Sequence, residues 1–172
     1  MVYLKCNMEV NIMRKFEIIS YEQYEKDLKD KCMYSDITLP GRSTKNSAGY
    51  DFKSPISFEL NPGEIIKVPT GIKACMNEDE FLAILVRSSM GFKYNIRLCN
   101  QVGIIDSDYY NNEGNEGHIY IALQNEGDKI FKANIGDNIA QGIFLKYNTV
   151  DEEEEITSSR TGGMGSTNKR GD

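Results

Sequence analysis

From residue 37 onward, the chain is divided into many short runs of β-forming residues, and this pattern limits the fold more than any other feature. Turn residues separate the runs: Asn-Pro-Gly-Glu follows residues 56–60, and Thr-Gly follows residues 65–69. No internal repeat is visible, and no strand–helix alternation of the kind that a parallel sheet needs. The pattern therefore predicts an all-β barrel or jelly roll. Further runs cover residues 72–76, 81–86, 96–100, 118–125, 129–134 and 138–147.

The two ends of the chain differ from this β-rich part. Residues 15–20 alternate enough to predict a strand, and residues 21–28 have a short helical periodicity. An acidic run at residues 151–155 repels itself and predicts an extended, solvated linker. The chain length suits one domain. We therefore expect a partly ordered N-terminal extension (1–35), a β domain (36–150), an acidic linker (151–159) and a flexible C-terminal arm (160–172).

Charge and composition exclude several function classes. The net charge of −6 argues against a general electrostatic grip on nucleic acid, so a polyanionic ligand would need a few local cations and backbone donors. Four widely spaced cysteines and the single histidine, His118, make a disulfide framework, a zinc site or a histidine-based triad improbable. No apolar run has the length of a membrane span, and no signal peptide is visible. We expect a cytoplasmic protein without a membrane partner.

The sequence RTGGMGST at residues 160–167 has the composition of a phosphate-binding arm. Its three glycines allow backbone N–H groups to approach an anion. Ser166 and Thr167 add hydroxyl donors, and Arg160 adds a planar cation that suits phosphate oxygens. Behind a solvated linker, such an arm could close over a ligand held elsewhere. By composition alone, a disordered Gly/Ser tail explains the segment equally well.

Four further segments precede this arm in a fixed order. The set comprises SAGYDF (47–52), RSSMG (87–91), NQVGIIDSDYY (100–110), GDNIAQ (136–141) and RTGGMGST (160–167). Together they resemble the five-motif signature of the trimeric deoxyuridine triphosphate nucleotidohydrolases (dUTPases), over about residues 39–167. The resemblance implies a jelly-roll homotrimer that hydrolyses dUTP to dUMP and pyrophosphate with Mg²⁺. Each active site would lie between subunits, and a phage or prophage origin is plausible.

The resemblance implies that Asp106 is the general base. Hydrolysis at the α-phosphorus needs an in-line water and a group that deprotonates it, and no catalytic histidine is at hand. Alone, the stretch around Asp106 reads equally well as a polar turn. Asp51 is expected to orient an arginine or a water molecule rather than bind metal. Mg²⁺ would be held by substrate phosphates and water, so no protein ligand to the metal is expected.

The same resemblance implies substrate contacts. Tyr109 would lie under the deoxyribose and leave no room for a 2′-OH, while Asn100 and the backbone near Gly103 and Ile105 would read uracil. An Asn-x-x-Gly stretch is often only a turn, and Arg87 could instead form an intersubunit ion pair. The remaining implied contacts are Arg87, Ser88, Ser89 and Gln141 for phosphate, Gly91 for close backbone packing, and Arg160, Met164, Gly165, Ser166 and Thr167 from the arm.

Three features depart from the family pattern. Met164 stands where the arm usually carries an aromatic residue that stacks on uracil, and Asn138 stands where the fourth motif usually begins with Arg. Residues 110–118 form a longer Gly- and Asn-rich loop, which we expect to project into solvent as a neutral insertion or to contact a protein partner. Two other functions stay open: a phage regulatory protein that binds a host repressor, and a dCTP deaminase-related enzyme.

Overall fold

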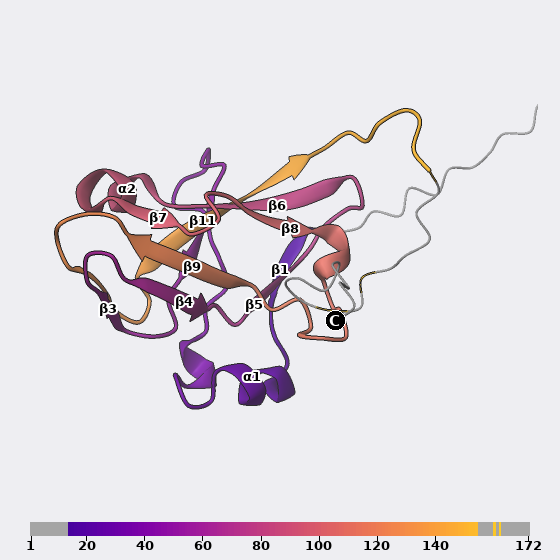
Figure 1. Ribbon diagram of the computed structural model, residues 1–172. Coiled ribbons are helices and arrows are strands. Elements are labelled where there is room, and N and C mark those ends of the chain that lie inside the picture. The colour runs from indigo at the N-terminus through magenta and orange to yellow at the C-terminus, as the bar shows by residue number, and fades with distance from the viewer. Residues whose placement is uncertain (1–13, 155–159, 161, 163–172) are drawn as a thin grey trace, which may run out of the picture.

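The computed structural model describes residues 14–154, 160 and 162, and its strands all pair antiparallel. The largest sheet has the order β2-β11-β6-β8, and a second sheet has the order β4-β9-β7 (Figure 1). The predicted all-β jelly-roll fold is confirmed. The strands are β1 (Lys15–Ile18), β2 (Tyr50–Lys53), β3 (Phe58–Leu60), β4 (Ile65–Pro69), β5 (Ile72–Cys75), β6 (Glu80–Leu85), β7 (Ile96–Leu98), β8 (Gly103–Asp106), β9 (Tyr120–Asn125), β10 (Phe131–Ala133) and β11 (Asn138–Lys146).

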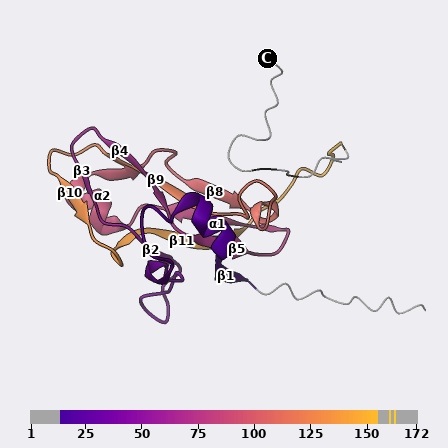
Figure 2. The same ribbon diagram turned by 90° about the horizontal axis from the view of Figure 1, so that it is seen from below.

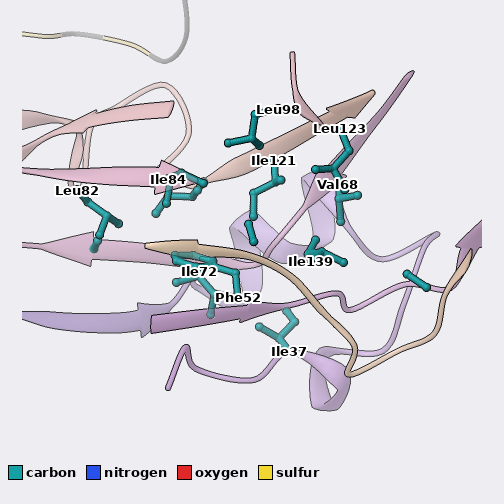
Figure 3. Packing of buried hydrophobic residues seen from close by; sticks show 14 of the residues in the cluster. Ile37, Phe52, Val68, Ile72, Leu82, Ile84, Leu98, Ile121, Leu123 and Ile139 are labelled. Atoms are coloured by element: carbon teal, nitrogen blue, oxygen red, sulfur yellow. The ribbon is translucent and has the colours of Figure 1, made fainter. Parts of the chain in front are cut away.

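The core lies between the two larger sheets. Figure 3 shows Leu82 and Ile84 of β6 on one side, and Ile121 and Leu123 of β9 on the other. Along β9 the exposure alternates with the period of two that a strand imposes, so every second side chain enters the core. Each fully buried Leu or Ile contributes about 1.5–3 kcal/mol relative to an exposed one. This packing fixes β6 and β9, which carry the residues around the site.

The N-terminal segment packs on the β domain. β1 pairs with β5, and α1 (Tyr21–Asp27) follows it, with the Ser20 hydroxyl accepting a hydrogen bond from the Gln23 N–H at 3.1 Å. Ile19 and Leu28, which flank α1, belong to the hydrophobic core. Figure 2, seen from below, shows α1 in front of the sheets. The predicted strand and helix in this segment are therefore confirmed.

The connection from β6 to β8 places the site residues. β6 leads into the short helix α2 (Ser88–Tyr94), which the sequence did not predict and which ends at Asn95 in the left-handed conformation. β7 then pairs with β9 in one sheet, whereas β8 pairs with β6 in the other. The turn at residues 99–102 therefore passes from one sheet to the other. Within the described residues, no helix has the length and apolar character needed to cross a membrane.

Candidate active site

A pocket of about 350 Å³ opens beside β8 and brings together the predicted nucleoside-binding residues. Its polar side chains come from the β7–β8 turn, from the end of β8 and the residues just after it, from the arm, and from Lys67 on β4 and Tyr120 on β9, while β6 and β7 supply apolar walls. The lining residues are Lys67, Ile84, Leu98, Asn100, Gly103, Ile104, Ile105, Asp106, Tyr109, Tyr120, Ala122 and Arg160.

The β7–β8 turn shapes one wall of this pocket. The Val102 N–H donates to the Asn100 carbonyl at 2.6 Å, and Gln101 has a positive φ of 63°. A Cβ at Gly103 would lie 3.1 Å from the Ile84 Cβ, so a larger residue would push the turn away from β6. β8 is the edge strand of its sheet, and no other described strand pairs with its outer side. Its outer N–H and C=O groups are therefore available to a ligand.

Asp106 lies at the end of β8, at the mouth of the pocket, and its side chain is 52% exposed. Asp108 follows in the short 3-10 helix η2 (Ser107–Tyr109). Arg160 donates to the Asp106 carboxylate at 2.7 Å and to the Asp108 carboxylate at 2.8 Å, and its guanidinium lies 5.7 Å from the centre of the Tyr109 ring. The arm's cation thus reaches the predicted base. The predicted arm residues Met164, Gly165, Ser166 and Thr167 lie outside the described residues.

Tyr109 is buried beneath this mouth, with only 6% of its surface exposed. Its hydroxyl donates to the His118 carbonyl at 3.0 Å and accepts from the Asn115 amide at 2.7 Å. Burial raises the pKa of the Tyr109 phenol, which therefore stays neutral at physiological pH. The ring is thus held through its hydroxyl and forms part of the pocket lining.

A second pocket, of about 460 Å³, contains the predicted phosphate-binding residues. Arg87 lies just before α2, and its Nε is 2.9 Å from a carboxylate oxygen of Asp51 on β2. The other Asp51 oxygen accepts from the Ser43 hydroxyl at 2.5 Å and from the Asn138 amide at 3.4 Å. Asp51 therefore orients the guanidinium within one chain. The lining residues are Ser43, Ser47, Ala48, Gly49, Asp51, Arg87, Ser88, Ser89, Gln141 and Ile143.

Two glycines near this pocket behave differently. A Cβ at Gly49 would lie 2.5 Å from the Gln141 side-chain oxygen, so Gly49 leaves room for that amide, which donates to the Val86 carbonyl at 3.3 Å. At Gly91 a Cβ would meet its nearest neighbours in this chain only at 4.0 Å, so the described residues of one chain do not make the close packing expected there, and that packing stays a prediction. Gly49 lies inside the first motif, where its place could have signalled this role.

The two pockets are too far apart to share one phosphate within a single chain. Asp106 on β8 pairs with Phe81 of β6, and Gln141 on β11 pairs with Leu85 at the other end of β6. Four residues of strand span about 13 Å and two strand spacings about 10 Å, which separates these two backbone positions by about 16 Å. The predicted base and the predicted phosphate-binding residues of one chain therefore line different pockets.

The loop at residues 110–118 differs from its prediction. We expected it to project into solvent, but Asn112, Gly117 and His118 are buried. The Glu116 carboxylate pairs with Lys73 at 2.8 Å and accepts from the Ser20 N–H at 2.9 Å. The expectation was wrong because hydrogen bonds, rather than an apolar pattern, hold this loop against the domain.

Metal-binding side chains are sparse around both pockets. Within the described part of the chain, no group of three or more His, Cys, Asp or Glu side chains could hold a metal ion. Asp106 and Asp108 are the acidic side chains at the mouth of the first pocket, and both are engaged by Arg160. Serine and amide groups dominate the second pocket, and they suit phosphate oxygens better than a cation cage.

Comparisons with known proteins agree with this geometry. The family model of dUTPase matches residues 35–168. The deoxyuridine 5′-triphosphate nucleotidohydrolase of Lactococcus lactis is 38% identical over 156 residues, which cover 90% of this chain and 97% of that protein. The crystal structure of dUTPase from Streptococcus mutans aligns with a TM-score of 0.65 at 38% identity, covering 80% of this chain and 98% of that one.

A third relative shares the fold at lower identity. The structure of a D95N mutant dUTPase from phage phi11 of S. aureus aligns with a TM-score of 0.62 at 18% identity, covering 85% of this chain and 97% of that one. With described residues of the first four motifs and Arg160 of the fifth gathered around two pockets, and with a family model and relatives that span most of its length, the chain belongs to the dUTPase family.

Proposed function

We propose that the chain hydrolyses dUTP to dUMP and pyrophosphate, with water attacking the α-phosphorus. The observation that carries this proposal is the grouping of the motif residues into a nucleoside pocket beside β8 and a phosphate pocket beside α2. The relatives named above are dUTP nucleotidohydrolases, and they favour this reaction over deamination of dCTP. The reaction limits uracil in DNA and supplies dUMP for thymidylate synthesis. We assign it to the cytoplasm, where the free thiols of Cys32, Cys75 and Cys99 would stay reduced.

Base recognition is assigned to the outer edge of β8 and to Asn100. Free backbone N–H and C=O groups next to an amide side chain can pair with the O4, N3–H and O2 edge of uracil. Cytosine would leave some of these polar groups unpaired inside the pocket, and a site built on hydrogen bonds rejects such a ligand strongly. Tyr109 supplies the surface under the deoxyribose.

Asp106 is the general base of the proposed mechanism. Its carboxylate accepts the proton of the attacking water, and its exposed position at the pocket mouth leaves room for that water. Arg87, fixed by Asp51, and the hydroxyls of Ser88 and Ser89 bind the phosphate oxygens.

The residues present fit a Mg²⁺ ion that would arrive with the nucleotide. Such an ion would be held by the substrate's phosphate oxygens and water, in keeping with its preference for retained waters, and would supply neutralisation of the phosphate charge. The phage phi11 relative is described as coordinating a structural Mg(II) ion. In the present chain, Asp106 and Asp108 are the acidic groups closest to the nucleoside pocket. Both pair with Arg160, which favours activating water and holding the arm over binding the metal directly.

The active enzyme is a homotrimer whose sites lie between subunits. The separation of about 16 Å between the Asp106 and Gln141 backbone positions supports this arrangement, because within one chain the two residues lie at opposite ends of β6 and line different pockets. A neighbouring copy would bring its phosphate pocket to the nucleoside pocket. A closed ring of identical subunits repeats such a contact at every site.

Mixing two inactive variants tests this arrangement. Asp106→Asn and Arg87→Ala chains, each nearly inactive alone, are co-expressed with different tags, and assemblies carrying both tags are isolated. If the two residues come from neighbouring chains, about a third of the sites in the doubly tagged trimers are restored, because one of the three junctions joins an intact Asp106 from one chain to an intact Arg87 from the other. Pyrophosphate release measures the recovery. Mixed assemblies as inactive as either variant would refute the intersubunit site.

A further inference from the structure

We propose that Asn115 is a positioning residue for Tyr109, and that the loop at residues 110–118 makes the enzyme selective for deoxyribose. The inference rests on the proposed place of Tyr109 under the sugar. A tyrosine ring excludes a 2′-OH only if it cannot retreat from the added oxygen. The loop makes hydrogen bonds to Tyr109 at two points, the hydroxyl of the side chain and the carbonyl of the backbone.

The contacts are direct. The Asn115 Nδ2 donates to the Tyr109 hydroxyl at 2.7 Å, and the hydroxyl in turn donates to the His118 carbonyl at 3.0 Å. The Asn112 Nδ2 donates to the Tyr109 carbonyl at 2.7 Å. The phenol is thereby bound by one donor and one acceptor, which fixes the ring in the direction along which it could slide.

The loop is preorganised by its own polar side chains. The Asn112 Oδ1 accepts from the Gly114 and Asn115 N–H groups at 3.0 and 3.1 Å, and the Asn115 Oδ1 accepts from the Asn112 amide at 2.8 Å. Gly117 has a φ of 81°, and a Cβ there would lie 2.7 Å from the Tyr109 carbonyl oxygen. Only glycine allows the loop to close this tightly against the tyrosine.

The N-terminal segment anchors the loop from outside. Glu116 bonds to Lys73 on β5 and to the Ser20 N–H before α1, and the His118 ring is 2.6 Å from the Asp27 carboxylate at the end of α1. Ser20 and Asp27 precede residue 35, where the match to the family model begins. Sugar selectivity in this chain thus depends on a segment outside the shared motifs.

Removing the hydrogen bond from Asn115 to Tyr109 should change kcat/KM for UTP more than kcat/KM for dUTP. The Tyr109 ring remains present in either case, so deoxyribose still packs on it. Without Asn115, the ring can shift to admit a 2′-OH, and the penalty against UTP falls. Loss of a hydrogen bond that holds a buried hydroxyl predicts a change in discrimination of about five- to tenfold.

The test compares kcat/KM for dUTP and UTP in four forms of the full chain: wild type, Asn115→Ala, Tyr109→Phe and the double variant. Tyr109→Phe keeps the ring but removes its hydroxyl, and with it the bonds to Asn115 and to the His118 carbonyl. Each single variant should raise the UTP/dUTP ratio of kcat/KM by at least about fivefold, and the double variant should not exceed Tyr109→Phe, because Asn115 acts on the ring through that hydroxyl. Asn61→Ala is the matched control, since it removes an exposed asparagine contact at 3.0 Å in a remote turn.

The outcomes separate the inference from the proposed function. A wild-type chain without dUTP hydrolysis would refute the function itself. Normal wild-type activity, combined with a folded Asn115→Ala variant whose UTP/dUTP ratio stays within about twofold, would refute the positioning role alone. Additive effects in the double variant would refute it as well. If Asn115→Ala does not fold, an unchanged ratio for Tyr109→Phe would still refute the positioning role, because that variant lacks the Asn115 bond as well as the His118 bond, and a raised ratio would support anchoring through the hydroxyl.

Discussion

Replacing His118 by leucine should cost a large part of the fold's stability. The imidazole is fully buried; its Nε2 accepts from the Gly71 N–H at 2.9 Å, and its Nδ1 lies 2.6 Å from the Asp27 carboxylate. Because Nε2 is an acceptor, Nδ1 carries the proton and donates to Asp27. Leucine has a similar volume but makes neither bond, so the Gly71 N–H stays buried without a partner and α1 loses a tie to the loop.

The magnitude follows from these two bonds. An unsatisfied buried N–H costs about 1–3 kcal/mol, and a lost hydrogen bond to a carboxylate about 1.5–3 kcal/mol. Asp27 is partly exposed and keeps its bond from Gln23 at 2.8 Å, which favours the lower end for the second contribution. The free energy of unfolding should therefore fall by about 2–5 kcal/mol, which corresponds to a drop in Tm of about 5–15 °C for a chain of this length.

Thermal melting followed by circular dichroism, with a urea titration beside it, measures this loss. Lys26→Ala is the control on the same helix: its exposed pair with Glu22 at 2.9 Å should contribute no more than about 0.5 kcal/mol. A His118→Leu variant that melts within about 2 °C of wild type would refute the reasoning.

The pH dependence of stability gives a second test of the role of His118. Burial lowers the pKa of His118 from its ordinary value of 6.5, so between the lowered value and 6.5 the unfolded chain binds a proton that the folded chain does not. Wild-type stability should therefore fall as the pH drops below 6.5, and this component is missing in His118→Leu. The difference in Tm between the two proteins should narrow from about pH 7.5 to about pH 5.5, and a constant difference would contradict the assignment.

Three further predictions concern the site. Asp106→Asn should keep dUTP binding, measured by calorimetry, and lower kcat by about 10²–10⁴-fold; near-normal turnover would exclude Asp106 as the base. Removing residues 160–172 should abolish or severely reduce hydrolysis while gel filtration and melting stay unchanged, and a large drop in Tm would show that the arm is structural instead. Met164→Phe should leave nucleotide affinity unchanged or raise it by up to about 1–3 kcal/mol through base stacking, so a clear loss of affinity would show that a ring does not fit there.

Hydrophobic pattern and turn residues were enough to predict most of the sheet. The run at residues 65–69 became β4 with the same bounds, and the run at 81–86 became β6, shifted by one residue. Helix α2 was missed because it is seven residues long and buries only Met90, which leaves no apolar periodicity to detect. Tyr120 and Lys67 of the nucleoside pocket were missed because neither belongs to a motif.

Contacts between polar side chains explain the remaining differences between the sequence-based predictions and the structure. The sequence of residues 110–118 has no apolar face. Side-chain hydrogen bonds of Asn112, Asn115 and Glu116 nevertheless hold this loop against the domain, so that part of it is buried. Asp51 and Arg87 are far apart in sequence, so their pairing depends on the neighbouring positions of β2 and α2 rather than on spacing. The division of the chain at residues 35 and 150 stays a prediction.

The most direct test of the proposed function is pyrophosphate release from dUTP, dCTP, dTTP and UTP, measured side by side with Mg²⁺ and the full chain. A pocket that reads the uracil edge and closes under a deoxyribose predicts rapid release from dUTP. Release from the other three nucleotides should be lower by orders of magnitude. Cytosine leaves polar groups of the site unpaired, the 2′-OH of UTP meets the Tyr109 ring, and the 5-methyl group of dTTP meets the β7–β8 turn. Comparable release from dCTP or UTP, or ammonia release from dCTP, would contradict the proposed function.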